Sequence, residues 1–119
     1  MNNRFPITIY HNPQCGTSRN ALAMIRDAGH EPTVIEYLKQ GWDRATLTQL
    51  LSAMQLSARD VLRVKGTNAE ELGLLSPDAP EEQLIEAMIM YPVLVNRPIV
   101  ITPVGVKLCR PAETVQALL

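Results

Sequence analysis

The stretch at residues 7–20 constrains the fold of this chain more than any other part of the sequence. Residues 7–10 alternate β-branched and aromatic side chains as a short strand does, and Asn12 and Pro13 then break the strand. Apolar residues follow at spacings of three and four until Gly29, which is typical of a helix and its end. The pattern therefore predicts a strand, a tight break and a helix, with Cys15 at the start of the helix.

A cysteine at the start of a helix lies where its thiolate is favoured. The first backbone N–H groups of a helix have no intrahelical partner, and the helix dipole is positive at that end. Both stabilise the thiolate, which is the attacking form of the side chain. The same N–H groups can hold a tetrahedral oxyanion, so we expect Cys15 to be an activated nucleophile beside an anion site.

The composition suits a globular chain. With 119 residues, 46% hydrophobic and 19% charged, the sequence fits one domain with a modest core, and its net charge of -1 indicates no polybasic surface for nucleic acid. Its apolar runs are too short to span a membrane, and residues 1–5 lack the apolar core of a secretory signal. We therefore expect a cytoplasmic protein.

The two cysteines are far apart in the sequence. Cys15 and Cys109 form neither a disulfide framework nor a metal-ligand spacing, so we expect two free thiols and no metal site. Cys109 lies on a short apolar strand pattern, which favours a core thiol over a reactive one.

Strand patterns flank a long helical middle section. Residues 33–37 read as a second strand, parallel to the first because a helix connects them. Residues 98–102 and 104–109 read as an antiparallel hairpin, and a last helix starts at residue 110. This order predicts an α/β protein of thioredoxin-like fold, a single domain over 1–119 with a small mixed sheet flanked by helices and an inserted helical subdomain at about 43–91.

Within the inserted section, polar caps precede four helical segments. Asp43 is a candidate N-cap, further caps stand at Ser57 and Asn68, and Asp78 precedes an acidic first turn with a proline. The expected buried faces are Leu47, Leu50, Leu51 and Met54 in the first helix, and Leu84, Ile85, Met88 and Ile89 in the last.

The cysteine heads the sequence Cys15-Gly16-Thr17-Ser18, where redox proteins of this fold carry two cysteines. Serine cannot form a disulfide, so an adduct on Cys15 has to be released by an outside thiol. His11, at the end of the first strand, could support the thiolate as a cation or by a hydrogen bond, or could only fix the loop through the backbone.

Three arginines stand at the ends of predicted elements. Arg63, Arg97 and Arg110 could together bind a dianionic oxyanion, because a guanidinium offers a planar fork of donors that lysine lacks. Their spacing alone does not show that they converge, and an isolated arginine is usually a solvated surface charge. In a thioredoxin-like fold the proline after Arg97 is commonly cis and faces the cysteine loop, which would present Arg97 there.

The run His11-Asn12-Pro13-Gln14-Cys15-Gly16-Thr17-Ser18-Arg19-Asn20 closely resembles the glutaredoxin-coupled arsenate reductases of bacteria. The likeness continues through Asn96-Arg97-Pro98-Ile99-Val100 and Leu108-Cys109-Arg110-Pro111 and covers essentially the whole chain, although this sequence ends sooner than well-known members.

The resemblance implies reduction of arsenate to arsenite through a covalent intermediate on Cys15. It assigns supporting catalytic roles to His11 and Ser18, and binding of the oxyanion to Arg63, Arg97 and Arg110. Glutathione would be the co-substrate and glutaredoxin the protein partner, with no tightly bound cofactor, no nucleic acid and no membrane.

Two other functions remain open at this point. The first is a monothiol redox enzyme that acts on glutathione mixed disulfides, which would need Cys15 but not all three arginines. The second is a regulator that binds RNA polymerase, as relatives of this superfamily do. Those regulators commonly carry two cysteines as a redox switch, which Ser18 precludes here.

Overall fold

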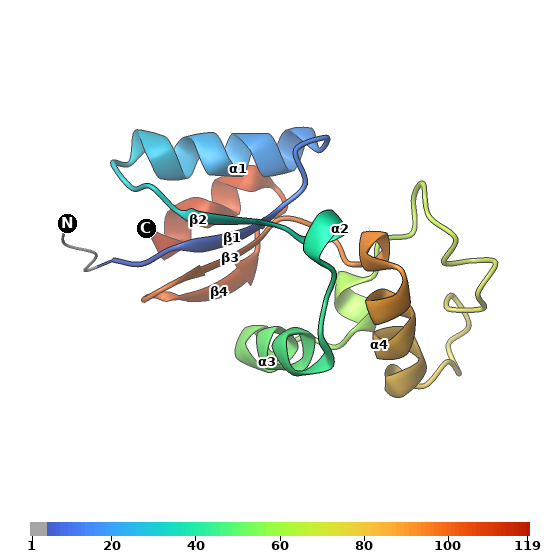
Figure 1. Ribbon diagram of the computed structural model, residues 1–119. Coiled ribbons are helices and arrows are strands. Elements are labelled where there is room, and N and C mark those ends of the chain that lie inside the picture. Colours follow the sequence, from blue (N-terminus) through green and yellow to red (C-terminus); the bar gives the residue numbers. More distant parts are fainter. Residues whose placement is uncertain (1–4) are drawn as a thin grey trace. The chain divides into compact units, whose positions relative to one another are not determined.

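A computed structural model describes residues 5–119, which divide into two compact units (Figure 1). The first unit joins the chain up to Gln40 with Arg97–Leu119, and the second is Gly41–Asn96. The segment from which we inferred the absence of a secretory signal lies mostly outside the described residues. The single-domain organisation stays a prediction.

The first unit is built on a four-stranded mixed sheet. Its strands are β1 (Thr8–His11), β2 (Thr33–Glu36), β3 (Ile99–Thr102) and β4 (Gly105–Leu108), in the order β2-β1-β3-β4. β1 and β2 are parallel, whereas β1 and β3, and β3 and β4, are antiparallel. The predicted parallel pair and hairpin are confirmed. The second strand stops one residue earlier than predicted, because Tyr37 begins the short helix α2 (Tyr37–Gln40).

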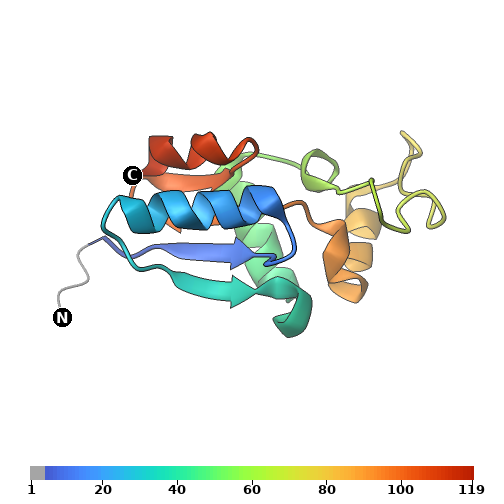
Figure 2. The same ribbon diagram turned by 90° about the horizontal axis from the view of Figure 1, so that it is seen from above.

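One face of this sheet is covered by α1 (Gly16–Asp27) and the 3-10 helix η3 (Ala112–Leu118), which lie side by side (Figure 2). Ile25 of α1 and Val115 of η3 pack with Ile9 and Val100 of the sheet, and all four are fully buried. Each such side chain contributes roughly 1.5–3 kcal/mol through burial. This core holds α1 and η3 against the sheet.

The end of α1 depends on a glycine. Gly29 has a φ of +91°, in the left-handed region that side chains with a Cβ rarely adopt, and its N–H donates to the carbonyl of Arg26. The chain can therefore turn back within a few residues and enter β2. The predicted helix stop at Gly29 is confirmed.

The second unit contains α3 (Arg44–Met54), the 3-10 helix η1 (Arg59–Val61), α4 (Glu81–Met90) and the 3-10 helix η2 (Pro92–Leu94). Asp43 is the N-cap of α3, as predicted, and its carboxylate accepts a hydrogen bond from the N–H of Thr46 at 2.6 Å. The buried faces of α3 and α4 also agree with the sequence pattern, except that Met54 and Ile89 are only partly buried.

The helix predicted to follow Asn68 is wrong, because residues 65–78 form a series of turns and bends. Gly66 and Gly73 lie within this stretch and have φ values of +76° and +75°. Only six residues lie between them, too few for the hydrogen bonds of a helix to offset the cost of its first turn. The polar cap was therefore followed by turns instead of a helix.

Arg59 fastens this irregular stretch to η1. Its guanidinium donates hydrogen bonds to three backbone carbonyls, those of Leu74 at 3.3 Å, Ser76 at 2.9 Å and Ala79 at 3.2 Å. A single planar cation thus satisfies acceptors along six residues of chain that has no secondary structure of its own.

We expect Arg59→Ala to loosen residues 65–79 while α3 and α4 stay folded. Hydrogen exchange followed by mass spectrometry should show roughly tenfold faster exchange in that stretch, because the lost hydrogen bonds lower its local opening free energy. Arg44→Ala, which removes exposed ion pairs to Glu82 and Glu86, serves as the control and should leave the stretch unchanged. Equal exchange in both variants would contradict the assigned role of Arg59.

Within residues 5–119, the structure contains no helix with the length and apolar character needed to cross a membrane.

Candidate active site

Cys15 occupies the N-cap position of α1, as the sequence predicts. Its backbone is extended, with φ -97° and ψ 122°, and its carbonyl accepts the first helical hydrogen bond from the N–H of Arg19 at 3.0 Å. Its own N–H donates to the carbonyl of Asn12, also at 3.0 Å, which closes the turn between β1 and the helix. Only 7% of the residue is exposed. The thiol therefore has a fixed place at the start of the helix.

The sulfur of Cys15 is surrounded by donors and positive charge. Burial raises its pKa, but hydrogen bonds from the backbone N–H of Ser18 and the guanidinium of Arg110, the charge of Arg97, and the N–H of Thr17 lower it by more. The net effect is a thiol pKa below its ordinary value, so the thiolate is favoured.

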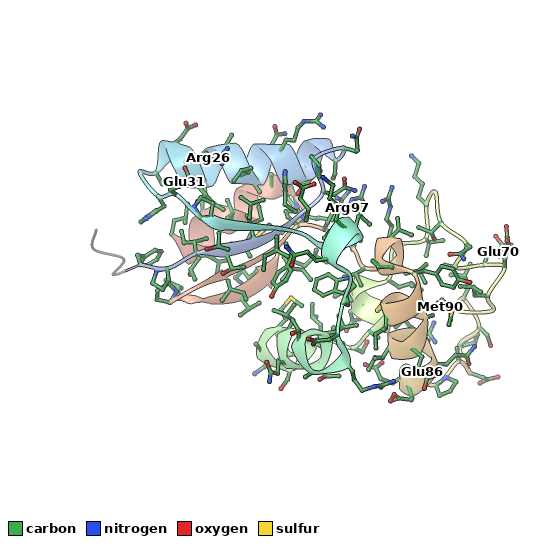
Figure 3. The ribbon with its side chains drawn as sticks, viewed as in Figure 1. Arg26, Glu31, Glu70, Glu86, Met90 and Arg97 are labelled. Carbon is green, nitrogen blue, oxygen red and sulfur yellow. The ribbon has the colours of Figure 1, made fainter. Side chains whose placement is uncertain are left out.

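Two of the three predicted arginines act on Cys15. The Nη1 of Arg110 is 3.7 Å from the sulfur and donates to the carbonyl of Arg97 at 3.0 Å, which orients the guanidinium. Arg97 lies on the segment that leads into β3 (Figure 3), and its peptide bond to Pro98 is cis, as expected for this position. Arg110 and Arg97 thus come together at Cys15 from the two ends of the β3–β4 hairpin.

Arg63 lies in the second compact unit. Its backbone N–H donates to the carbonyl of Leu94 at 2.8 Å, and its Nε donates to the carbonyl of Lys65 at 3.2 Å. Its part in binding an oxyanion stays a prediction.

His11 and Ser18 form a buried pair beside the cysteine turn. The Nδ1 of His11 is 2.7 Å from the hydroxyl oxygen of Ser18, and that oxygen also accepts the N–H of Asn12 at 3.1 Å. Burial lowers the pKa of His11; the charge of Glu36 opposes this, while the charges of Arg26 and Arg19 add to it.

The lowered pKa favours a neutral imidazole at neutral pH, and its Nδ1 shares a hydrogen bond with the Ser18 hydroxyl. The sequence left open whether His11 supports the Cys15 thiolate as a cation, and the lowered pKa of His11 disfavours this role. His11 is instead connected to Cys15 through Ser18, whose backbone N–H donates to the sulfur.

Two residues near the cysteine have roles that the sequence interpretation missed. The side-chain oxygen of Asn12 accepts the N–H of Gln14 at 2.9 Å, and the Nη1 of Arg19 donates to the carbonyl of Pro13 at 2.8 Å. The first contact has a sequence signal, because asparagine often bonds to the backbone two residues ahead in a turn. The second depends on the helix geometry and has no comparable signal.

Cys109 is a core residue, as predicted. It is fully buried among the apolar side chains between the sheet and η3, and burial raises the pKa of its thiol to about 12, although the charge of Lys107 acts in the opposite direction. Within the described residues, both cysteines are free thiols. Their environments separate them into one activated and one inert thiol.

We expect this difference to appear in alkylation with iodoacetamide. Because the pKa of Cys15 is lowered, the pH at which its reaction rate is half-maximal should lie below that of an ordinary thiol. Cys109 should remain unmodified in the folded protein. Peptide mass spectrometry over a pH series checks this, and a midpoint for Cys15 at or above that of an unstructured cysteine peptide would contradict the assignment.

A cysteine at the start of the first helix, beside a mixed sheet with this strand order, defines a thioredoxin-like protein. A family model described as the ArsC family matches residues 10–118. The chain belongs to the ArsC family, which confirms the resemblance noted in the sequence.

Individual relatives agree with this assignment. The arsenate reductase of Rhizobium meliloti (strain 1021) is 54% identical over 113 residues, which cover 95% of this chain and 81% of that protein. The arsenate reductase of Escherichia coli (strain K12) is 50% identical over 113 residues, covering 95% and 80% respectively. The solved structure of the arsenate reductase from Vibrio cholerae superposes with a TM-score of 0.92 at 34% identity, over 98% of this chain and all of that one. The predicted thioredoxin-like fold is confirmed.

Proposed function

We propose that this protein reduces arsenate to arsenite through a covalent intermediate on Cys15, with glutathione as co-substrate and glutaredoxin as the protein that completes the reduction. The observation that carries the proposal is the Arg110 guanidinium placed 3.7 Å from a helix-start thiol. The relatives named arsenate reductase, at 50% and 54% identity, give the substrate.

In the first step the Cys15 thiolate attacks arsenic(V) and forms a sulfur–arsenic bond. One arsenate oxygen accepts a proton and leaves as water, so the oxidation state of arsenic does not change. Arsenate carries negative charge on its remaining oxygens, and the guanidinium groups of Arg110 and Arg97 offset that charge. Arg63 is proposed as a third such group.

The second step needs outside thiols because Ser18 stands where a second cysteine would close a disulfide. The glutathione thiol replaces another arsenic-bound oxygen, which leaves as water. A glutaredoxin thiolate then attacks the glutathione sulfur. The bond between that sulfur and arsenic breaks, and its electron pair passes to arsenic, which becomes arsenic(III). The products are a glutathione–glutaredoxin mixed disulfide and, after water displaces the cysteine, arsenite and free Cys15.

His11 and Ser18 support this chemistry without touching arsenic. Their hydrogen bond holds Ser18 in place, and the N–H of Ser18 stabilises the thiolate that attacks and later leaves. The mechanism uses no metal and no tightly bound cofactor. Reduced glutathione and glutaredoxin are found together in the cytoplasm, which is the location we propose.

The proposal is tested by measuring arsenite formation with purified protein, arsenate, glutathione and a recycled glutaredoxin. We expect many turnovers in the complete mixture, and at most one arsenite per protein when glutaredoxin is omitted. Absence of arsenite from the complete mixture would overturn the function, and sustained turnover without added thiols would overturn the mechanism.

A further inference from the structure

Asn12 contacts three parts of the cysteine turn although only 4% of it is exposed. Its N–H donates to the hydroxyl of Ser18 at 3.1 Å, and its carbonyl accepts the N–H of Cys15 at 3.0 Å. Its side-chain oxygen accepts the N–H of Gln14 at 2.9 Å. The turn that carries the nucleophile is therefore fastened at three points to one residue.

Only the third contact uses the side chain of Asn12, because the other two use backbone groups that every residue except proline has. The side-chain contact fixes the Pro13–Gln14 peptide, in the turn that leads to Cys15. That peptide sets the direction in which the chain enters α1, and with it the position of the sulfur relative to the first N–H groups of the helix.

The chemistry of the side chain suits this place. The amide of asparagine accepts a hydrogen bond without carrying charge, whereas an aspartate would place a carboxylate three residues from the thiolate and disfavour its ionisation. The groups that act on the Cys15 sulfur are the guanidinium groups of Arg110 and Arg97 and the N–H groups of Thr17 and Ser18. A neutral acceptor leaves this positive surrounding unchanged.

We propose that the side-chain oxygen of Asn12 is a positioning group for the nucleophile: by holding the N–H of Gln14, it keeps the N–H groups of Thr17 and Ser18 directed at the Cys15 sulfur. The inference rests on the proposed function, because only that function makes Cys15 the nucleophile toward arsenate. The test itself measures the reactivity of the Cys15 thiol and needs no arsenate.

The test compares Asn12→Ala with Asn12→Ser. Alanine cannot accept the hydrogen bond from Gln14, whereas the hydroxyl of serine can form the equivalent turn. Loss of one turn hydrogen bond is small against the stability of a domain, so we expect both variants to fold, which circular dichroism verifies.

The readout is the pH at which alkylation of Cys15 by iodoacetamide is half-maximal. We expect Asn12→Ala to raise the pKa of Cys15 by about half a unit to one unit, which slows alkylation three- to tenfold at a pH below the midpoint. Asn12→Ser should keep the pKa of Cys15 close to its wild-type value. Asn20→Ala, the same substitution at an exposed position of α1, should give the wild-type curve.

An unchanged midpoint in Asn12→Ala would overturn the inference. An equally raised midpoint in Asn12→Ser would overturn it too. Both outcomes are independent of arsenate. If the Asn12 variants shift the midpoint as expected but wild-type protein produces no arsenite, the proposed function fails while the role of Asn12 stands.

Discussion

Cys15→Ser is expected to reduce arsenite formation at least about a thousandfold, because a hydroxyl in this place is not ionised at neutral pH and cannot form the sulfur–arsenic bond. The loss should appear in kcat and should persist at saturating arsenate. Binding of arsenate itself should survive, because Arg110 and Arg97 remain. Initial rates of arsenite formation over a range of arsenate concentrations measure both effects.

Cys109→Ala is the matched control. It removes the other thiol of the chain, from the core and away from the site, and should keep the wild-type rate while lowering the free energy of unfolding by about 1 kcal/mol. A rate that survives in Cys15→Ser, or one that disappears in a folded Cys109→Ala, would show that the nucleophile has been misassigned.

Substitution of Arg110 has the second largest expected effect. Arg110→Ala removes a donor to the Cys15 sulfur and a positive charge from the substrate, so kcat/KM for arsenate should fall by about a hundredfold. The Arg110 guanidinium lowers the pKa of Cys15, and its removal therefore raises that pKa. At a fixed pH less thiolate is present, and the rising limb of the pH–rate profile moves to higher pH.

Arg110→Lys separates charge from geometry. Lysine keeps the positive charge but loses the planar fork. Compared with Arg110→Ala, we therefore expect Arg110→Lys to lower the pKa of Cys15 part of the way back to its wild-type value and to regain little of the arsenate rate. Arg26→Lys, at an exposed ion pair with Glu31 (Figure 3), should leave both quantities unchanged. An enzyme for glutathione mixed disulfides would instead tolerate Arg110→Lys in that reaction, and equal arsenate rates in Arg110→Lys and wild type would contradict a need for the planar fork.

The local part of this site could be predicted from the sequence, because it depends on residues close together in the chain. The alternation at residues 7–10, the break at Pro13 and the helical spacing that follows were enough to place Cys15 at the start of a helix. The hairpin near the C-terminus was equally clear from its turn residues. Each of these features is determined by backbone preferences over a few residues.

The approach of Arg110 to Cys15 could not be predicted in the same way. Ninety-five residues separate the two, and their contact depends on β4 and η3 packing against β3 and α1. The protonation of His11 was also beyond the sequence, because it follows from burial rather than from neighbours in the chain. The helix predicted after Asn68 shows that a local signal can also mislead, since Gly66 and Gly73 favour turns there despite a favourable cap.

The most direct test of the central claim is the mass of the Cys15 peptide after wild-type protein has been incubated with arsenate and glutathione, with glutaredoxin omitted, and then acid-quenched. We predict an arsenic- and glutathione-bearing adduct on Cys15, absent from Cys109 and lost when glutaredoxin is added. Full arsenite turnover with no adduct on Cys15 at any time, or an adduct on another residue, would contradict a mechanism in which this thiol attacks arsenate and passes its product to an outside thiol.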